Sequence, residues 1–223
     1  MRRPPSEVKR TPNSGVAAAA REPRAHGRIL DATRALLEEV GYAGVTMEAV
    51  AKRADVGKPT LYRWWQNKAA LVHESLLLPY EQLDFVSTGH LELDLRMAIE
   101  STVHFFARPL VQRAWLGVVV DLRADAGAHE QIYETWMRPA VEHIGMVLAA
   151  AAERGECRPD ADPAAVVDAM LGMCIFEMTL PAKRGRPQAT LASSILALVM
   201  HGVAVPAAQR KLAASRAGGR PRT

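Results

Sequence analysis

The sequence predicts an all-α protein of about nine helices. Three observations favour this fold class. Ala, Leu, Arg and Glu, which suit helices, dominate the 223 residues, whereas aromatic residues make up only 5%. Apolar residues recur at helical spacing over several long stretches. They also make up 49% of the chain, enough for a substantial core, and no internal repeat is visible.

The first helix is expected over residues 24–40. Its buried face is marked by five residues at helical spacing: Ile29, Thr33, Leu36, Leu37 and Val40. Gly41 follows, and a glycine tolerates the left-handed conformation that commonly ends a helix. Residues 1–23 are rich in Pro and Arg without a helical period, so they are predicted to form a disordered basic arm.

A second and a third helix are expected directly after the first. Thr46 is a good N-cap for the second helix because its hydroxyl can accept from a free backbone N–H. Residues 55–57 read as a tight turn, and the third helix is predicted over residues 58–65, with Pro59 in its first turn. Asn67 is expected to cap a fourth helix.

The third helix has a narrow buried side. Leu61 and Trp65 lie one turn apart and can pack inward together. The other side chains of the helix then face outward, and several of them can donate hydrogen bonds to phosphates or to base edges: Lys58, Thr60, Tyr62, Arg63 and Trp64. A short helix of this kind, held by its neighbours, is typical of a helix-turn-helix that enters a major groove.

Five or six further helices are expected after residue 71. Helical periods mark residues 95–106 and 114–122, and a longer helix is predicted over residues 130–154, bent near Pro139. Asp162 before Pro163 is a specific helix start. The last two helices are predicted over residues 163–180 and 187–203, joined by a basic turn at 183–186.

The charge is unevenly distributed. The net charge of +4 hides two basic ends, since residues 1–28 and 207–223 each carry +5, while residues 29–206 carry −6. An acidic body with basic ends is the distribution expected when only one end of a protein meets a polyanion. No run of about 18 apolar residues is present, so no contact with a membrane is expected.

The blocks TMEAVAKRADV and GKPTLYRWWQNKAAL resemble the DNA-binding region of the TetR (tetracycline-repressor-like) family of bacterial transcription regulators. Val56-Gly57 replaces the valine–serine that is usual there, Trp65 replaces a common phenylalanine, and Trp64 stands where histidine or tyrosine is usual. The resemblance is strongest over residues 24–71 and continues more faintly in RGECRPDADPAAVVDAMLGMCIFE.

The resemblance implies a set of DNA-contacting residues. Thr46 and Lys68 match the phosphate clamps at the starts of the second and fourth helices, and the recognition helix and its flanks supply the rest: Lys58, Pro59, Thr60, Tyr62, Arg63 and Trp64. It also implies a homodimeric repressor that binds a palindromic operator in double-stranded DNA and is released by a small-molecule effector. Such a protein is expected in the cytoplasm, associated with the nucleoid.

The predicted domains are a basic arm (1–23), a helix-turn-helix domain (24–71), a ligand-binding and dimerisation domain (72–203) and a basic tail (204–223). Residues 163–180 are too apolar to face water, so we expect them to pair with 187–203 in a four-helix dimer interface. The interface residues would be Val167, Met170, Leu171, Cys174, Leu191, Ile195 and Leu198. Burial in the core of a single chain is the alternative.

A ligand pocket is expected in the larger domain, lined by aromatic and methionine side chains around a few polar groups. Its candidates are His104, Phe105, Trp115, Asp121, Trp136, Met173, Phe176 and Glu177. The same residues at helical spacing are equally compatible with ordinary core. Asp121 or Glu177, if buried, would favour a ligand with a donor or a positive charge.

An all-α enzyme and a ligand-binding protein or scaffold without DNA function are the alternative classes. The sequence contains no G-x-S-x-G, H-E-x-x-H, Walker loop or dinucleotide fingerprint, and no paired-cysteine metal site. A nucleophilic dyad of Cys157 or Cys174 with His143 is the remaining enzymatic option. We expect no cofactor, no metal and free cysteine thiols.

Overall fold

The computed structural model describes residues 14–77, 87–180 and 187–205, which are almost entirely helical. The front half holds α1 (Ser14–Gly44), α2 (Met47–Arg53), α3 (Lys58–Trp64) and α4 (Lys68–Leu77). The body holds α5 (Leu91–Ala107), α6 (Pro109–Arg123), α7 (Ala126–Ile132), the π-helical segment η1 (Tyr133–Met137), α8 (Arg138–Glu153), α9 (Pro163–Thr179) and α10 (Gln188–Val203). α7, η1 and α8 follow one another without a break, so they are counted as one helix. The described residues then contain nine helices, as predicted.

The first helix begins earlier than predicted. It starts at Ser14, so residues 14–23, which were expected to belong to a disordered arm, are helical. Its regular part ends at Gly41, where φ is 66° and ψ is 176°; the positive φ suits glycine, but ψ differs from that of the left-handed helical conformation that was expected. Residues 1–13 of the predicted arm lie outside the described residues, as do Pro79, the basic turn at 183–186 and most of the C-terminal tail.

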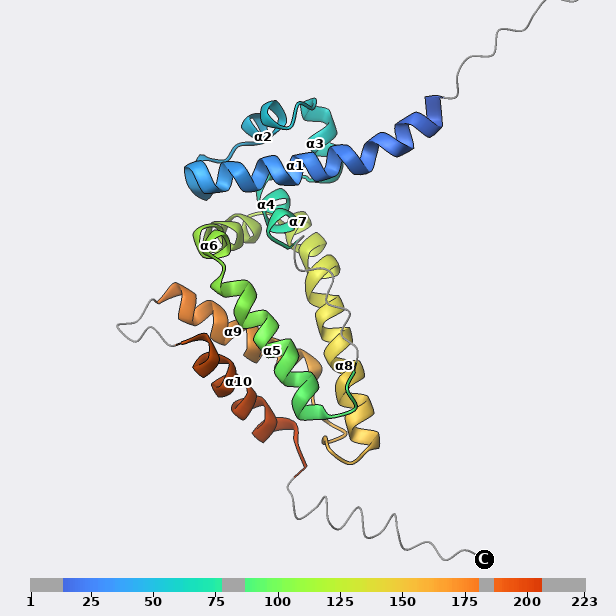
Figure 1. Cartoon of the computed structure of the whole chain (residues 1–223), viewed down its shortest axis with the longest axis vertical. Helices are drawn as coiled ribbons and strands as arrows, with labels where there is room; N and C mark the ends of the chain where they lie inside the picture. The colour runs from blue at the N-terminus through green and yellow to red at the C-terminus, as the bar shows by residue number, and fades with distance from the viewer. Residues whose placement is uncertain (1–13, 78–86, 181–186, 206–223) are drawn as a thin grey trace, which may run out of the picture.

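The front half lies at one end of the molecule, with α2 and α3 farthest from the body (Figure 1). α4 connects the two halves and packs against both α1 and α6, and α1 itself packs against α6. The buried residues of α4 belong to one core that is continuous from α1 to α10. The predicted domain boundary between residues 71 and 72 therefore falls inside a helix that both halves share.

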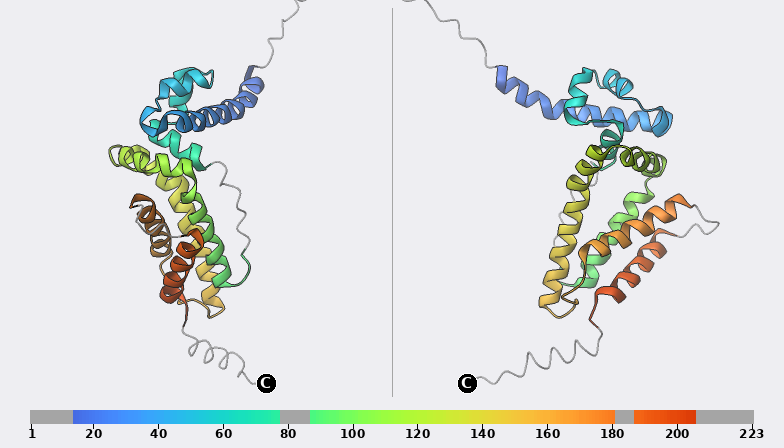
Figure 2. Two further views of the ribbon diagram at one scale, coloured as in Figure 1. Left: turned by 60° about the vertical axis from the view of Figure 1, so that its left-hand side comes forward. Right: turned by 180° about the vertical axis from the view of Figure 1, so that it is seen from behind.

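The body is a helical bundle in which α5 packs against α8, α9 and α10 (Figures 1 and 2). The long helix that was predicted to bend near Pro139 contains the π-helical segment η1, which ends two residues before Pro139. Proline cannot donate the hydrogen bond that a regular helix needs. Asp162 caps α9 by accepting from the Ala164 N–H at 2.9 Å, as predicted. Within the described residues, none of the helices combines the length and apolar character needed to cross a membrane.

Candidate nucleic-acid interface

The predicted cap and turn of the helix-turn-helix are present. Thr46 caps α2, and its Oγ1 accepts from the Ala49 N–H at 3.1 Å. The turn places Asp55 in the left-handed region with φ 52°, a conformation that aspartate tolerates better than most residues. Gly57 precedes α3 in an extended conformation, and Pro59 lies in the first helical turn. These local features fix where α3 begins and how it is aimed away from α2.

α3 buries one side and exposes the other. Leu61 and the C-capping Trp65 are both fully buried, as predicted from their one-turn spacing. Lys58, Pro59 and Arg63 are exposed, and Tyr62 retains 49% of its accessible surface. Thr60 is half-buried. The outward side of this seven-residue helix is therefore cationic and rich in hydrogen-bond donors.

Lys58 and Glu48 form a pair across the turn, with 2.8 Å between Nζ and Oε1. The hydrogen bond raises the pKa of Lys58 and lowers that of Glu48. Both side chains are more than half exposed, so water screens the pair and it contributes little to stability. It nevertheless holds the lysine side chain along α2, from which it can exchange to a ligand.

The C-terminal end of α3 is anchored by a polar cluster from three helices. The Trp65 indole Nε1–H donates to Glu74 on α4 at 2.6 Å, and the other oxygen of Glu74 lies 2.8 Å from His26 on α1. The His26 ring stacks on Trp65 at 5.0 Å between centroids. A buried indole N–H thereby keeps a hydrogen-bond partner. Neither His26 nor Glu74 was predicted from the sequence, because their shared partner lies in another helix.

Trp64 packs partly against α1. It is half-buried, and its ring contacts His26 and Trp65 edge-on at 5.2 and 5.6 Å. The Arg63 guanidinium lies 5.2 Å from the centre of the Trp64 ring. The side chain is therefore packed against α1, and its ring also contacts the Arg63 guanidinium.

Lys68 lies in the first turn of α4, at the junction with the body. Its Nζ lies 3.4 Å from the Tyr42 carbonyl oxygen, 4.0 Å from the centre of the Tyr42 ring and 3.7 Å from Asp121. Asn67 caps α4 as predicted, accepting from the Ala70 N–H at 3.0 Å. Asp121 was predicted to line a ligand pocket, but the structure places it at this junction, bound to Tyr42.

The residues predicted for a ligand pocket separate into two groups. Phe105, Trp115 and Trp136 gather around His73 of α4, with the Trp115 and Trp136 rings 5.8 and 5.3 Å from the His73 ring. His104 and Phe176 are exposed, which is incompatible with lining the interior. Met173 and Glu177 lie half-buried on α9. The five residues outside the cluster are thus distributed over the junction and the surface.

His73 was not predicted as a site residue. Its ring is 2% exposed, and burial lowers its pKa to about 4, so it is neutral at pH 7. Its Nε2 and the Nε1–H of Trp115 are buried without a hydrogen-bond partner in the part of the chain that the structure describes. Two buried polar atoms in this state are costly, so they are candidates for hydrogen bonds to a ligand or to water.

The predicted dimer-interface residues require correction. Five of the seven are buried in the core of the single chain: Val167, Met170, Cys174, Leu191 and Ile195. They pack inside the body and leave no surface for a partner. Leu171 is half-buried, and Leu198 is 57% exposed. The large apolar side chains that α9, its C-cap and α10 expose are instead Phe176 at 62%, Leu180 at 55% and Leu198.

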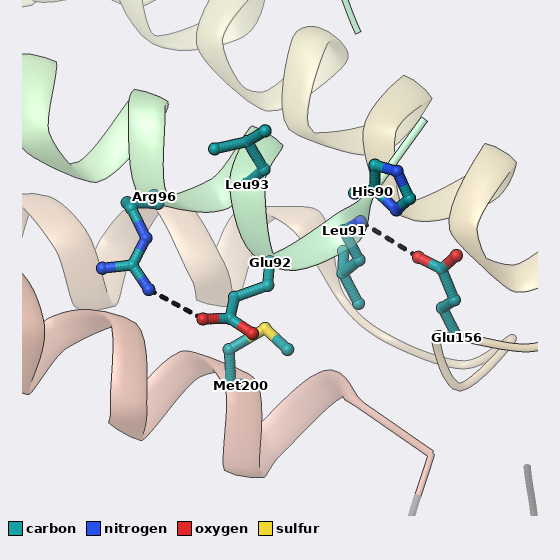
Figure 3. Close-up of a pocket in the computed structure, with 7 residues that line it drawn as sticks. All are labelled: His90, Leu91, Glu92, Leu93, Arg96, Glu156 and Met200. Carbon is teal, nitrogen blue, oxygen red and sulfur yellow. Dashed lines mark hydrogen bonds and ion pairs between the residues drawn. The ribbon is translucent and has the colours of Figure 1, made fainter. Parts of the chain in front are cut away.

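A surface hollow of about 500 Å³ lies where the first turn of α5 meets the end of α10 (Figure 3). None of the residues predicted for the ligand pocket line it. Its charged groups are engaged with one another or with the backbone, since Arg96 pairs with Glu92 at 2.7 Å and Glu156 accepts from the Leu91 N–H at 3.0 Å. Arg96, Glu92 and Glu156 in this hollow are therefore already paired.

Both cysteines are free and buried. Burial raises the pKa of Cys157, and it raises the pKa of Cys174 to about 12. A thiol with a raised pKa is protonated at neutral pH and is a poor nucleophile. The burial and the raised pKa of both thiols accordingly give no support to the cysteine–histidine dyad that the sequence left open.

Comparison with protein families gives two matches that together cover most of the chain. Residues 29–75 match the model described as bacterial regulatory proteins, tetR family. Residues 85–199 match the model described as tetracyclin repressor-like, C-terminal domain. The second match alone spans more than half of the 223 residues.

Individual relatives agree with these matches. The HTH-type transcriptional regulator YdeS of Bacillus subtilis is 29% identical over 166 residues, 72% of this chain and 81% of its own. The HTH-type transcriptional repressor KstR of Rhodococcus jostii is 49% identical over 57 residues, 26% of this chain and 27% of its own. The crystal structure of the regulator SCO0332 superposes with a TM-score of 0.64 at 26% identity, covering 82% of this chain and 99% of that one.

Proposed function

We infer that this chain, which belongs to the tetR family of bacterial regulatory proteins, is a homodimeric repressor that binds a palindromic operator and is released from it by a small molecule. Membership of the family makes the chain a helix-turn-helix transcriptional regulator and not an enzyme. The proposal adds the residues that contact DNA, the formation of a dimer and the release from DNA by an effector. It assigns DNA recognition to residues 24–71 and the effector and dimer contacts to residues 72–203.

One observation carries the DNA-binding assignment. The outward side of α3 presents Lys58, Tyr62 and Arg63 while Leu61 and Trp65 fix the helix from behind. Lys58 and Pro59, at the N-terminal end, are suited to base edges, since an ammonium pairs with guanine O6/N7 and an apolar ring packs on a thymine methyl. Tyr62 and Arg63 are suited to phosphates. Thr46 and Lys68, at the starts of α2 and α4, would clamp the backbone on either side.

The test is a titration of the DNA immediately upstream of the gene. We expect specific binding whose affinity falls steeply with salt, because each phosphate contact releases counterions. A random duplex of the same length is the control and should bind more weakly. Equal affinity for both duplexes at every salt concentration would remove operator recognition from the proposal.

We assign the dimer contact to the exposed apolar side of α9 and α10. Phe176, Leu180 and Leu198 are each more than half exposed, and solvation of large apolar side chains is unfavourable. A second copy related by a two-fold axis would cover the same residues on both chains. A dimer also suits a short recognition helix, because two half-sites about 34–36 Å apart, or a multiple of this distance, then share the binding energy.

We assign the effector site to the aromatic cluster around His73. The support is the pair of unpartnered polar atoms, His73 Nε2 and Trp115 Nε1, enclosed by Phe105 and Trp136. α4 carries His73 and also reaches the DNA-reading half through Glu74, so occupancy would bias the position of α4. FadR of Bacillus subtilis, which shares the fold with a TM-score of 0.58 at 17% identity over 79% of this chain and 98% of its own, was crystallised with stearoyl-CoA.

Ligand screening tests this assignment. Compounds that quench tryptophan fluorescence and release the operator should lose their effect in Trp115→Phe, which removes the indole donor and keeps an aromatic ring. Arg138→Gln, on the exposed side of α8, is the matched control. An effector whose action is unchanged by Trp115→Phe and by His73→Phe would place the site elsewhere.

A further inference from the structure

The junction between the DNA-reading half and the body contains a compact group of one acid, one phenol and one ammonium. Asp121, near the end of α6, accepts from the Tyr42 hydroxyl at 2.6 Å. The Lys68 Nζ lies 3.7 Å from the same Oδ2 of Asp121. The ammonium also lies 4.0 Å from the centre of the Tyr42 ring, within range of a cation–π interaction. Three helices, α1, α4 and α6, are thereby joined through one carboxylate oxygen.

The surrounding packing holds this group in place. Gly117, one turn before Asp121, is the reason that Tyr42 fits, since a Cβ at position 117 would overlap the Tyr42 ring. Burial, followed by the hydrogen bond to Asp121, raises the pKa of Tyr42, so its hydroxyl remains a donor. Just beyond α6, Asp125 accepts from Asn67 Nδ2 at 2.6 Å. The end of α6 thus contacts both residues that open α4.

We propose that Asp121 competes with a DNA phosphate for Lys68 and so sets the DNA affinity of the protein from within the body. This inference rests on the proposed function, in which Lys68 clamps the DNA backbone. A lysine in the first turn of a helix faces the positive end of the helix dipole, so it needs a nearby anion. In this structure Asp121 supplies that anion. A phosphate that approaches α4 must take its place.

The size of the effect follows from the exposure of the pair. The Lys68 side chain retains 25% of its accessible surface and that of Asp121 retains 47%, so water screens their attraction. Pairs of this kind are weak, and losing one changes an equilibrium by about two- to fivefold. The direction of the change in DNA affinity distinguishes competition from a structural role. If Asp121 lowers affinity by competing, its removal tightens DNA binding, whereas if it orients the DNA-reading half, its removal weakens binding.

The test uses the full-length protein and a fluorescein-labelled duplex of random sequence at low salt, with fluorescence anisotropy as the readout. Asp121→Asn keeps an acceptor for the Tyr42 hydroxyl and removes the charge, and it should bind about two- to fivefold more tightly. Lys68→Gln should bind more weakly and lower the slope of log K against log salt by about 1. In the Lys68→Gln background, Asp121→Asn should produce no gain.

Asp125→Asn is the matched control, because it removes a neighbouring negative charge that accepts from Asn67. Equal gains from both aspartate variants, or a gain that persists without Lys68, would identify general repulsion and overturn the competition. Unchanged or weaker binding by Asp121→Asn would also overturn it. Asp121→Ser replaces this variant if it fails to fold, as judged by circular dichroism.

The outcomes also separate this inference from the proposed function. Wild-type protein that binds no duplex contradicts the proposed function. The competition, which rests on that function, then fails with it. Wild-type binding without the predicted gain contradicts the competition alone.

Discussion

α3 and α9 each expose one side to solvent in the single chain, but the two exposed sides differ in polarity. α3 has seven residues and presents Lys58, Tyr62 and Arg63 to solvent, a side to which water is already a good partner. α9 has seventeen residues and presents Phe176 to solvent at 62% exposure, a side to which water is a poor partner. Exposure to water is therefore less favourable for the Phe176 side of α9 than for the outward side of α3.

This difference indicates the order in which the two surfaces are covered. Burial of large apolar side chains provides a stabilising free energy at any salt concentration. Phosphate contacts provide one that depends on salt and on the presence of DNA. The contact through α9 and α10 is therefore expected to be permanent, while the contact through α3 is made and released. Substitutions on the two surfaces should therefore affect DNA binding and dimer formation separately.

The largest expected effect is on DNA binding alone. The triple substitution of Lys58, Tyr62 and Arg63 by alanine removes three exposed side chains that contribute about 1–1.5 kcal/mol each, so operator affinity should fall by about two to three orders of magnitude. The oligomeric state, measured by analytical ultracentrifugation, should not change. Lys52→Ala, an exposed lysine at the end of α2, is the control.

The second expected effect is on the dimer. Phe176→Glu combined with Leu198→Glu places charges where apolar contacts are proposed, and dimer affinity should fall at least about a hundredfold. Both residues are exposed in the single chain, so its folding should be retained. Operator binding should fall as well, because only one half-site is then held. Met146→Glu, at a residue 66% exposed on α8, is the matched control, and equal dissociation by this control would move the interface.

The third expected effect is a pH dependence of stability carried by His73. Its pKa is about 4 when folded and 6.5 when unfolded, so below pH 6.5 the unfolded chain binds the extra proton and stability falls until about pH 4. The loss is about 3 kcal/mol. His73→Phe should remove this pH dependence. The free energy of unfolding of the variant minus that of the wild type should therefore increase as pH falls from 6.5 to 4. A difference that is constant with pH would mean that His73 is not buried in the neutral form.

The smallest expected effect is on the helix that supports α3. Thr46→Ala removes the cap of α2 and should lower stability by about 1 kcal/mol, or Tm by about 2–4 °C. Thr179→Ala is the control, because that hydroxyl donates to the Ile175 carbonyl of its own helix and caps no free N–H. Equal losses from the two variants would show that the Thr46 cap contributes nothing specific.

The front half was well predicted because short-range chemistry determines it. The cap at Thr46, the turn before Gly57 and the pair Leu61 and Trp65 each depend on residues within one turn of the chain. The sequence therefore contains the whole cause of each feature. The start of α1 was not predicted, because the helical residues before Arg24 show no apolar period.

The body was predicted as a set of helices but not as a set of contacts. A helix that is apolar all round carries no sequence signal for which side is buried, so Met170 and Ile195 were assigned to a partner while the structure buries them in the same chain. Asp121 was assigned to a ligand because its partner, Tyr42, lies 79 residues earlier. His73 was missed for a related reason, since Phe105, Trp115 and Trp136 come from other elements.

Gly117 has a consequence for how this sequence can diverge. Because a side chain at position 117 would overlap the ring at position 42, neither position is free to vary alone. A larger residue in α6 is compatible with the fold only together with a smaller one at the end of α1. Homologues that carry a side chain at the first position are expected to have lost the tyrosine at the second, and with it the phenol that holds Asp121.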